Sequence, residues 1–170
     1  MSLEIRAVDF DHHTARTLVF AQQFEIALMY DVDPATYAVL DAPGKPTSAE
    51  FDASQQGAFH VAYLNNRPIA CGGMRRCAAE PRRTAEIKRM FTRPEGRQQG
   101  AARAVLSSLE DAACVFGYEA MVLETGLVQA GAIVLYEKMG YRRIAKYGKY
   151  AGDPLSLCYR KQLDVAAAVL

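Results

Sequence analysis

Hydrophobic and polar positions alternate along several short stretches of the chain, and this period of two predicts strands. Leu3–Val8 alternates in this way and is expected to form a first strand. Ala58–Leu64 and Pro68–Arg75 are rich in strand-forming residues and flank the polar turn Asn65-Asn66-Arg67, a pattern typical of a hairpin. Arg83–Thr92 follows after a looser connection and is expected to complete an antiparallel meander.

A second pattern, with apolar residues three or four positions apart, predicts helices. Thr14–Tyr30 is expected to be an amphipathic helix, capped by Asp11, because large apolar side chains recur at Phe20, Phe24 and Leu28. Asp33-Pro34 predicts the start of a short second helix, because aspartate caps helices and proline suits the first helical position.

Helices and strands alternate in the second half of the chain. Gln98–Phe116 is a predicted helix and Glu119–Glu124 a buried strand, so the strand before the helix should pair with it in parallel through a right-handed crossover. Gln129–Met139 is another predicted helix. Tyr141–Tyr147 and Leu155–Lys161 can pair as a closing hairpin, and the tail after it is expected to be frayed or helical.

Length and charge narrow the class of protein. The chain has 170 residues, of which 51% are hydrophobic and 23% charged, so residues 1–170 are expected to form a single globular domain. The net charge is +1, so no overall field favours nucleic acid or an anionic membrane. No signal peptide or membrane span is expected, because Glu4, Arg6 and Asp9 interrupt the apolar start and no apolar run reaches about 20 residues. The default is a cytoplasmic enzyme or binding protein.

The cysteines give no sign of a metal. Cys71, Cys77, Cys114 and Cys158 form no CxxC pair, and no histidine lies at zinc-ligand spacing from them. Reduced and mostly buried thiols are therefore expected, with no metal ion.

One stretch, Glu86–Ala102, predicts an anion-binding device. A strand leads into the turn Arg93-Pro94-Glu95-Gly96, and Arg97–Ala102 then opens the long helix with small residues. The free N–H groups of a first helical turn and the positive end of the helix dipole converge on one point. This arrangement suits a phosphate or pyrophosphate.

Two short segments carry a family resemblance. Arg97-Gln98-Gln99-Gly100-Ala101-Ala102 resembles the acetyl-CoA signature of the GCN5-related N-acetyltransferases (GNAT), which is Gln or Arg, two residues, Gly, one residue, then Gly or Ala. Ala132–Tyr141 resembles the second signature of the same family. The resemblance covers about Ala58–Leu163 and implies an α/β (α+β) fold. Its sheet would be mixed and mostly antiparallel, with about six or seven strands splayed in the middle and about four helices.

The resemblance implies acetyl-CoA as co-substrate and assigns residues to it. The pantetheine arm would pair with a strand edge formed by the backbone of Met90, Phe91 and Thr92. The pyrophosphate would bind at Arg97, Gln98, Gln99, Gly100, Ala101 and Ala102. Ala132 and Tyr136 would line the cofactor site, together with Gln129, which stands where the family often has an asparagine.

The acceptor amine must lose a proton before it attacks, and the thiolate that leaves must gain one. By resemblance, Glu86 is the base or positions a water; its alternative role is a salt bridge with Lys88 or Arg89. Glu124 is a second candidate base. Tyr136 would be the acid, and its alternative is a core aromatic.

Relatives build the acceptor pocket from the first two helices and the closing loop, so the pocket is expected near Phe24, Tyr30, Glu124, Tyr147, Tyr150 and the loop Gly148–Pro154. The leading hypothesis is N-acetylation of a primary amine on a small molecule or a protein, with homodimers common in the family. The alternative is an acyl-CoA-binding module without turnover. A nucleotide-binding domain is disfavoured, since neither a P-loop nor GxGxxG is present.

Overall fold

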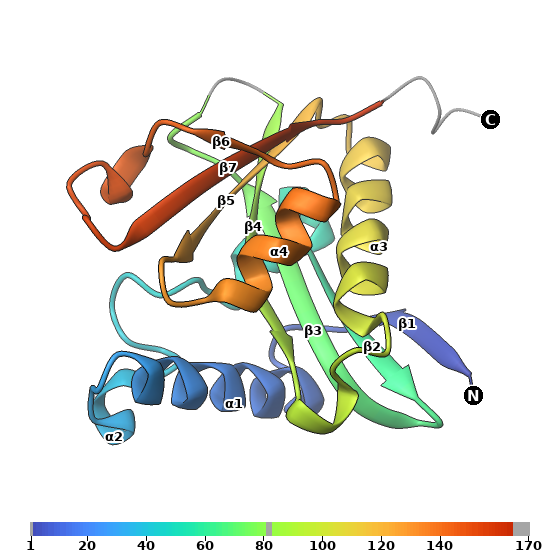
Figure 1. Ribbon diagram of the computed structural model, residues 1–170. Coiled ribbons are helices and arrows are strands. Elements are labelled where there is room, and N and C mark those ends of the chain that lie inside the picture. The colour runs from blue at the N-terminus through green and yellow to red at the C-terminus, as the bar shows by residue number, and fades with distance from the viewer. Residues whose placement is uncertain (1, 81–82, 165–170) are drawn as a thin grey trace.

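Seven strands form one open sheet in the order β1-β2-β3-β4-β5-β7-β6 (Figure 1). The structure, a computed structural model, describes residues 2–80 and 83–164. The strands are β1 Leu3–Ala7, β2 Ala58–Leu64, β3 Arg67–Arg76, β4 Thr84–Thr92, β5 Ala120–Gly126, β6 Arg142–Ile144 and β7 Ser156–Gln162. Neighbouring strands are antiparallel except β4 and β5, which are parallel. The predicted meander, parallel crossover and closing hairpin are therefore confirmed.

Four α-helices cover the two faces of the sheet within the described residues: α1 His13–Met29, α2 Pro34–Tyr37, α3 Ala101–Val115 and α4 Ala130–Lys138. Helices α3 and α4 pack on one face and α1 on the other (Figure 1). Short 3₁₀ turns complete the connections: η1 Ser48–Phe51, η2 Ala53–Gln55, η3 Pro94–Gly96 and η4 Gly148–Tyr150. None of the helices within residues 2–80 and 83–164 has the length and apolar character to span a bilayer.

Local sequence signals explain two of these connections. Asn65 and Asn66 both adopt positive φ, 50° and 64°, as a two-residue hairpin turn of the primed type requires. Asp33 caps α2 by accepting a hydrogen bond from the N–H of Ala35 at 3.0 Å. The chain after Asp164, where a frayed or helical tail is expected, lies outside the described residues.

The predicted apolar face of α1 is wrong, although the helix itself is confirmed. Phe20, Phe24 and Leu28 are 50%, 44% and 62% exposed. The buried face is instead Thr14, Ala15, Leu18, Val19, Gln22, Gln23 and Ala27. The predicted cap is also wrong, because His12 Nδ1, not Asp11, accepts from the Thr14 N–H at 3.3 Å. Two glutamines on the buried face show that its second half covers a polar space rather than the core.

The sheet opens between β4 and β5. The two strands pair only from Thr84 with Ala120 to Ile87 with Leu123. Beyond that point β4 carries a bulge: Gly73 faces Lys88 and Cys71 faces Phe91, so two residues, Arg89 and Met90, stand against Gly72. A bulge bends its strand and increases the local twist, which separates the end of β4 from β5. This is the splay expected in the middle of the sheet.

The long helix begins later than predicted. Helix α3 starts at Ala101 rather than Gln98, because Gly100 is its N-cap with φ 77° and Gln98 has φ 61°. Neither left-handed residue can belong to a right-handed helix. The turn before α3 is therefore longer, and the free N–H groups of the first helical turn belong to Ala101, Ala102 and Arg103.

Leu109 anchors α3 to the sheet, and its removal tests the packing that positions the turn. The side chain is fully buried in the larger core cluster, so Leu109→Ala is expected to lower the free energy of unfolding by about 3 kcal/mol. Val115, which is 79% exposed on the same helix, is the control, and Val115→Ala should change the free energy of unfolding by about 0.5 kcal/mol or less. Urea denaturation measures both; equal losses would contradict this account of the core.

Candidate functional site

Two cavities meet where β4 leaves β5. The first cavity, of about 510 Å³, lies between the end of β4, the start of α3 and helix α4. The second cavity, of about 480 Å³, lies among α1, the loop after α2, strands β4 and β5, and η4. Both are lined by Gln22, Ile26, Met90, Gln129 and Tyr136. A molecule in one cavity can therefore touch a molecule in the other.

The far end of the first cavity has the features of an anion site. It is lined by Gly96, Arg97, Gln98, Gly100, Ala101, Ala102 and Arg103. The first intrahelical bond of α3 runs from Ala104 N to Gly100 O, so the three N–H groups before it have no partner in the helix. A bound phosphate there would accept these bonds and meet the positive end of the helix dipole.

Two side chains of the predicted signature are already engaged. Arg97 forms an ion pair with Glu25 at 2.6 Å and donates to the Thr92 carbonyl at 3.2 Å. Gln99 does not line the cavity, and its Nε2 donates to the Glu95 carbonyl at 2.8 Å. The backbone N–H groups of this turn, rather than these two side chains, are therefore the groups left free to bind an anion.

The middle of the first cavity is a strand edge. Met90, Phe91 and Thr92 line it, and β5 does not pair with β4 this far along. Gln22 Nε2 donates to the Met90 carbonyl at 2.9 Å, so α1 fixes the position of this edge. The Phe91 side chain is buried in the core cluster that includes Ala15, Leu18 and Val19 of α1, which leaves only the Phe91 backbone for a ligand.

Tyr136 stands at the junction of the cavities. It projects from α4, is only 4% exposed, and packs edge-to-face on Tyr141 with ring centroids 5.9 Å apart. Burial, and then the nearby Glu124, raises the pKa of Tyr136 well above its ordinary value. Its hydroxyl therefore keeps its proton near neutral pH. Gln129 is the N-cap residue of α4 and lines both cavities, and Ala132 lines the first.

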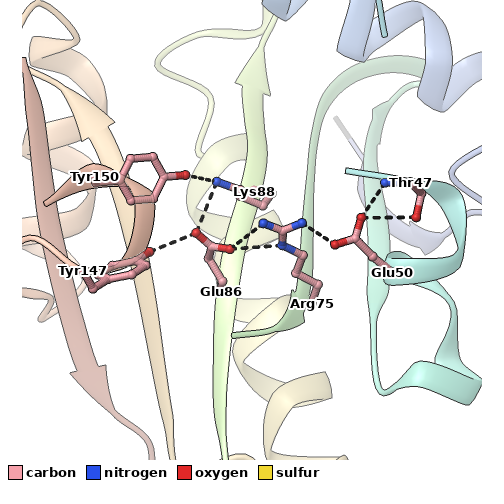
Figure 2. A network of polar contacts seen from close by, with 7 residues as sticks. All are labelled: Thr47, Glu50, Arg75, Glu86, Lys88, Tyr147 and Tyr150. Atoms are coloured by element: carbon pink, nitrogen blue, oxygen red, sulfur yellow. Dashed lines mark hydrogen bonds and ion pairs between the residues drawn. The ribbon is translucent and has the colours of Figure 1, made fainter. Parts of the chain in front are cut away.

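Glu86 lies in a buried polar network rather than on a cavity wall (Figure 2). Its Oε2 accepts from Arg75 at 3.0 and 2.9 Å, and its Oε1 accepts from the Tyr147 hydroxyl at 3.1 Å and forms an ion pair with Lys88 at 3.2 Å. Neither Glu86 nor Tyr147 lines either cavity. Lys88 connects this carboxylate to the second cavity, because it also donates to the Tyr150 hydroxyl.

The network extends across β3 to the segment before β2 (Figure 2). Arg75 forms a second ion pair with Glu50, which accepts from Thr47. Burial alone would raise the pKa of Glu86, but the charges of Lys88 and Arg75 outweigh it and hold this pKa below its usual value. Glu86 is therefore ionised and fully coordinated.

The predicted acceptor residues separate into two groups. Tyr30, Glu124 and Tyr150 line the second cavity. Phe24 and Tyr147 line neither cavity, since Phe24 is exposed to solvent and the Tyr147 hydroxyl donates a hydrogen bond to Glu86. The Tyr30 hydroxyl lies 1.7 Å from where a β-carbon on Gly126 would be, so a larger residue at position 126 would require the Tyr30 side chain to move.

Lys149 and Asp153 of the expected Gly148–Pro154 loop also line the second cavity. Further residues of this cavity were not predicted as site residues: Gln22, Tyr37, Lys45, Lys88 and Arg89. One signal in the sequence could have indicated this cavity: the polar pair Gln22-Gln23 lies one helical turn after Leu18 and Val19, on the face that α1 buries. No sequence signal marked the bulge that places Arg89. In residues 2–80 and 83–164, no cluster of three or more His, Cys, Asp or Glu could hold a metal ion.

Comparison with known proteins places the chain among acetyltransferases. The sequence profile described as the acetyltransferase (GNAT) family matches residues 26–141. A protein of Azospirillum brasilense named IAA acetyltransferase is 44% identical over 105 residues, which are 62% of this chain and 67% of that protein.

Solved structures share the fold. An acyl-CoA N-acyltransferase of Klebsiella pneumoniae superposes with a TM-score of 0.74 at 23% identity, over 95% of this chain and 98% of that one. A PaiA N-acetyltransferase of Thermoplasma acidophilum, solved with coenzyme A, superposes at 0.67 with 14% identity, over 95% and 99%.

The pairing of Glu86 predicts how stability depends on pH. Glu86→Gln removes the charge that Arg75 and Lys88 share, and should lower the free energy of unfolding at pH 7 by about 3 kcal/mol. Because the pKa of Glu86 is lower in the folded state, its contribution is complete above the unfolded value near 4.5 and is lost as pH falls through the folded value.

The difference between wild type and variant should therefore narrow toward pH 3, as followed by thermal unfolding at several pH values. Glu119→Gln is the matched control, because Glu119 pairs with Arg83 at the surface, where both side chains are about half exposed. A Glu86 variant as stable as the Glu119 variant would disprove the network's role.

Proposed function

Because the chain belongs to the GNAT family of acetyltransferases and is an acyltransferase, we propose that it transfers an acetyl group from acetyl-CoA to a primary amine by direct attack. The observation that carries this proposal is the meeting of two cavities at Tyr136. One cavity ends in an anion-binding helix start and the other carries charged groups suited to a polar acceptor. The reaction needs this arrangement, since two substrates must meet within bonding distance.

The first cavity fits the parts of coenzyme A. The N–H groups of Ala101, Ala102 and Arg103 suit its pyrophosphate, and the backbone of Met90–Thr92 suits the amides of its pantetheine arm. Acetyl-CoA supplies an activated acyl group as a thioester. Arg97 supports the cofactor less directly, because Glu25 already neutralises it.

Tyr136 is the proposed acid. As the amine nitrogen bonds to the acetyl carbon and the carbon–sulfur bond breaks, the thiolate takes a proton from the Tyr136 hydroxyl. The raised pKa of Tyr136 keeps that proton in place until a stronger base forms beside it. Its position on both cavity walls supports contact with the sulfur of a bound cofactor.

Glu124 is better placed than Glu86 to receive the proton of the amine. It lies on the second cavity wall at the end of β5, where its Oε1 accepts from the Ser156 hydroxyl at 2.6 Å. Glu86 lies off both walls, and its lowered pKa makes it a weak proton acceptor. We assign Glu124, directly or through water, as the base, and Glu86 as a positioning residue that holds Lys88 and thereby Tyr150.

The proposal is tested by thiol release from acetyl-CoA with a panel of primary amines, with the product identified by mass. Acetylated amine at a rate well above hydrolysis is expected. Binding of acetyl-CoA without turnover for every amine would instead favour a non-catalytic acyl-CoA-binding module.

Tyr136→Phe isolates the acid. Removal of one hydroxyl should lower kcat about tenfold or more, while the KM for acetyl-CoA changes little, because the lost interaction exists only while the thiolate forms. Tyr141→Phe is the matched control: Tyr141 is buried beside Tyr136 but lines neither cavity, so kcat should be retained. Unchanged turnover of Tyr136→Phe between pH 6 and 9 would refute this role.

A further inference from the structure

Arg89 holds an unusual backbone position on the wall of the second cavity. It is the first of the two residues in the β4 bulge and has φ 62°, in the left-handed region that costs a side-chain-bearing residue about 1 kcal/mol. A left-handed residue that is not Gly, Asn or Asp persists when its surroundings fix it, often at a binding site. Here the bulge places the arginine on the second cavity, among the walls built by α1 and the loop after α2.

The Arg89 guanidinium has no anionic partner among the described residues. Its Nε is buried and makes no hydrogen bond. Burial lowers the pKa of Arg89, and the groups that affect this pKa most after burial are Tyr37, Cys71, Arg75 and Tyr150, none of which is a carboxylate. Three other partly buried cations do have a carboxylate partner, in the contacts Lys88–Glu86, Arg160–Glu80 and Lys161–Glu110. A half-buried unpaired charge is costly unless a ligand neutralises it.

Two more cations line the same cavity. Lys45 donates to Gln23 Oε1 at 2.8 Å and lies 4.6 Å from the ring centroid of Tyr37, and Lys149 lies 5.5 Å from that of Tyr150. Burial, and then the charges of Arg89 and Lys149, lowers the pKa of Lys45, so both of these cations act on Lys45.

Carboxylates occupy a different part of the wall. Glu124 and Asp153 both accept from the Ser156 hydroxyl, at 2.6 and 3.0 Å. With Lys88 neutralised by Glu86, three cations face two carboxylates in this cavity, which leaves one positive charge. A single carboxylate would neutralise it, whereas a phosphate dianion would exceed it.

We propose that the acceptor is an amine that also carries a carboxylate, and that Arg89 binds this carboxylate while the amine lies toward Glu124 and Tyr136. The planar guanidinium can donate two parallel hydrogen bonds to a carboxylate, and Lys45 and Lys149 add charge around it. This assignment rests on the proposed acetyl transfer and adds the class of its acceptor. Arg89 is a specificity-determining residue and takes no part in proton transfer.

The test compares each of several amino acids with its carboxamide as acceptor. Phosphoethanolamine, an amine that carries a phosphate instead of a carboxylate, tests whether the site prefers a phosphate. In wild type, the carboxylate form should have a kcat/KM about tenfold or more above the amide, as expected for a charge-assisted bidentate contact. In Arg89→Gln this preference should fall to about threefold or less through the acceptor's KM, with the KM for acetyl-CoA unchanged. Arg93→Gln is the control, because Arg93 lines neither cavity.

Equal use of acids and amides by wild type, a preference for phosphoethanolamine, or a preference that survives in Arg89→Gln would overturn the proposal. A measurement without turnover separates it from the proposed reaction. With coenzyme A present, succinate should raise the melting temperature of wild type but not of Arg89→Gln, and succinamide should raise neither. If no amine is acetylated but succinate still raises the melting temperature of wild type, only the proposed acetyl transfer is refuted. If amines are acetylated but succinate has no effect, only the carboxylate site is refuted.

Discussion

The structure depends on one interruption of pairing, the point after Ile87 and Leu123 where β4 stops following β5. Parallel strands that continued to pair would close the sheet and leave no room for a ligand. The bulge at Arg89 and Met90 prevents this, and one irregularity thus has three results. It frees the Met90–Thr92 edge, opens cavities on both sides of Tyr136, and places an arginine on the acceptor wall. The backbone cost at Arg89 is small beside the core packing of α1 and α3, which holds the bend in place.

The network around Glu86 fixes the other half of the acceptor cavity. It links η1, β3, β4 and η4 through Glu50, Arg75, Glu86 and Lys88 (Figure 2), of which Glu86 and Lys88 are the most buried. Such buried pairs contribute little net stability relative to apolar packing, but each member is costly to leave unpaired. The arrangement is therefore well suited to fixing position. Lys88 and Tyr150 are held at the cavity by a carboxylate that itself never reaches it.

Local patterns and the family signatures predicted most of the fold, because hairpin turns, helix caps and strand order depend on nearby residues. The Asn65-Asn66 turn and the Asp33 cap are of this kind. The prediction was wrong for α1, where the repeat of Phe20, Phe24 and Leu28 gave the correct period but the opposite face. Which face of a helix is buried depends on the elements that pack against it. The cavity lined by Gln22 and Gln23 results from the separation of β4 from β5, which the sequence of α1 does not encode. The pairing of Arg97 with Glu25, the network of Glu86 and the lack of a partner for the buried Arg89 Nε likewise depend on distant segments, which one sequence does not encode locally.

The Gln22 side chain has a consequence for how two ligands influence each other. It lines both cavities and holds the carbonyl of Met90, so a ligand that orders α1 from the acceptor side also orders the edge offered to the other ligand. Thermodynamic linkage makes this coupling reciprocal: if one bound ligand changes the affinity of the other by some factor, the second changes the affinity of the first by the same factor. The shared wall of five residues is thus a place where substitutions can change cooperativity between substrates without touching the reacting atoms.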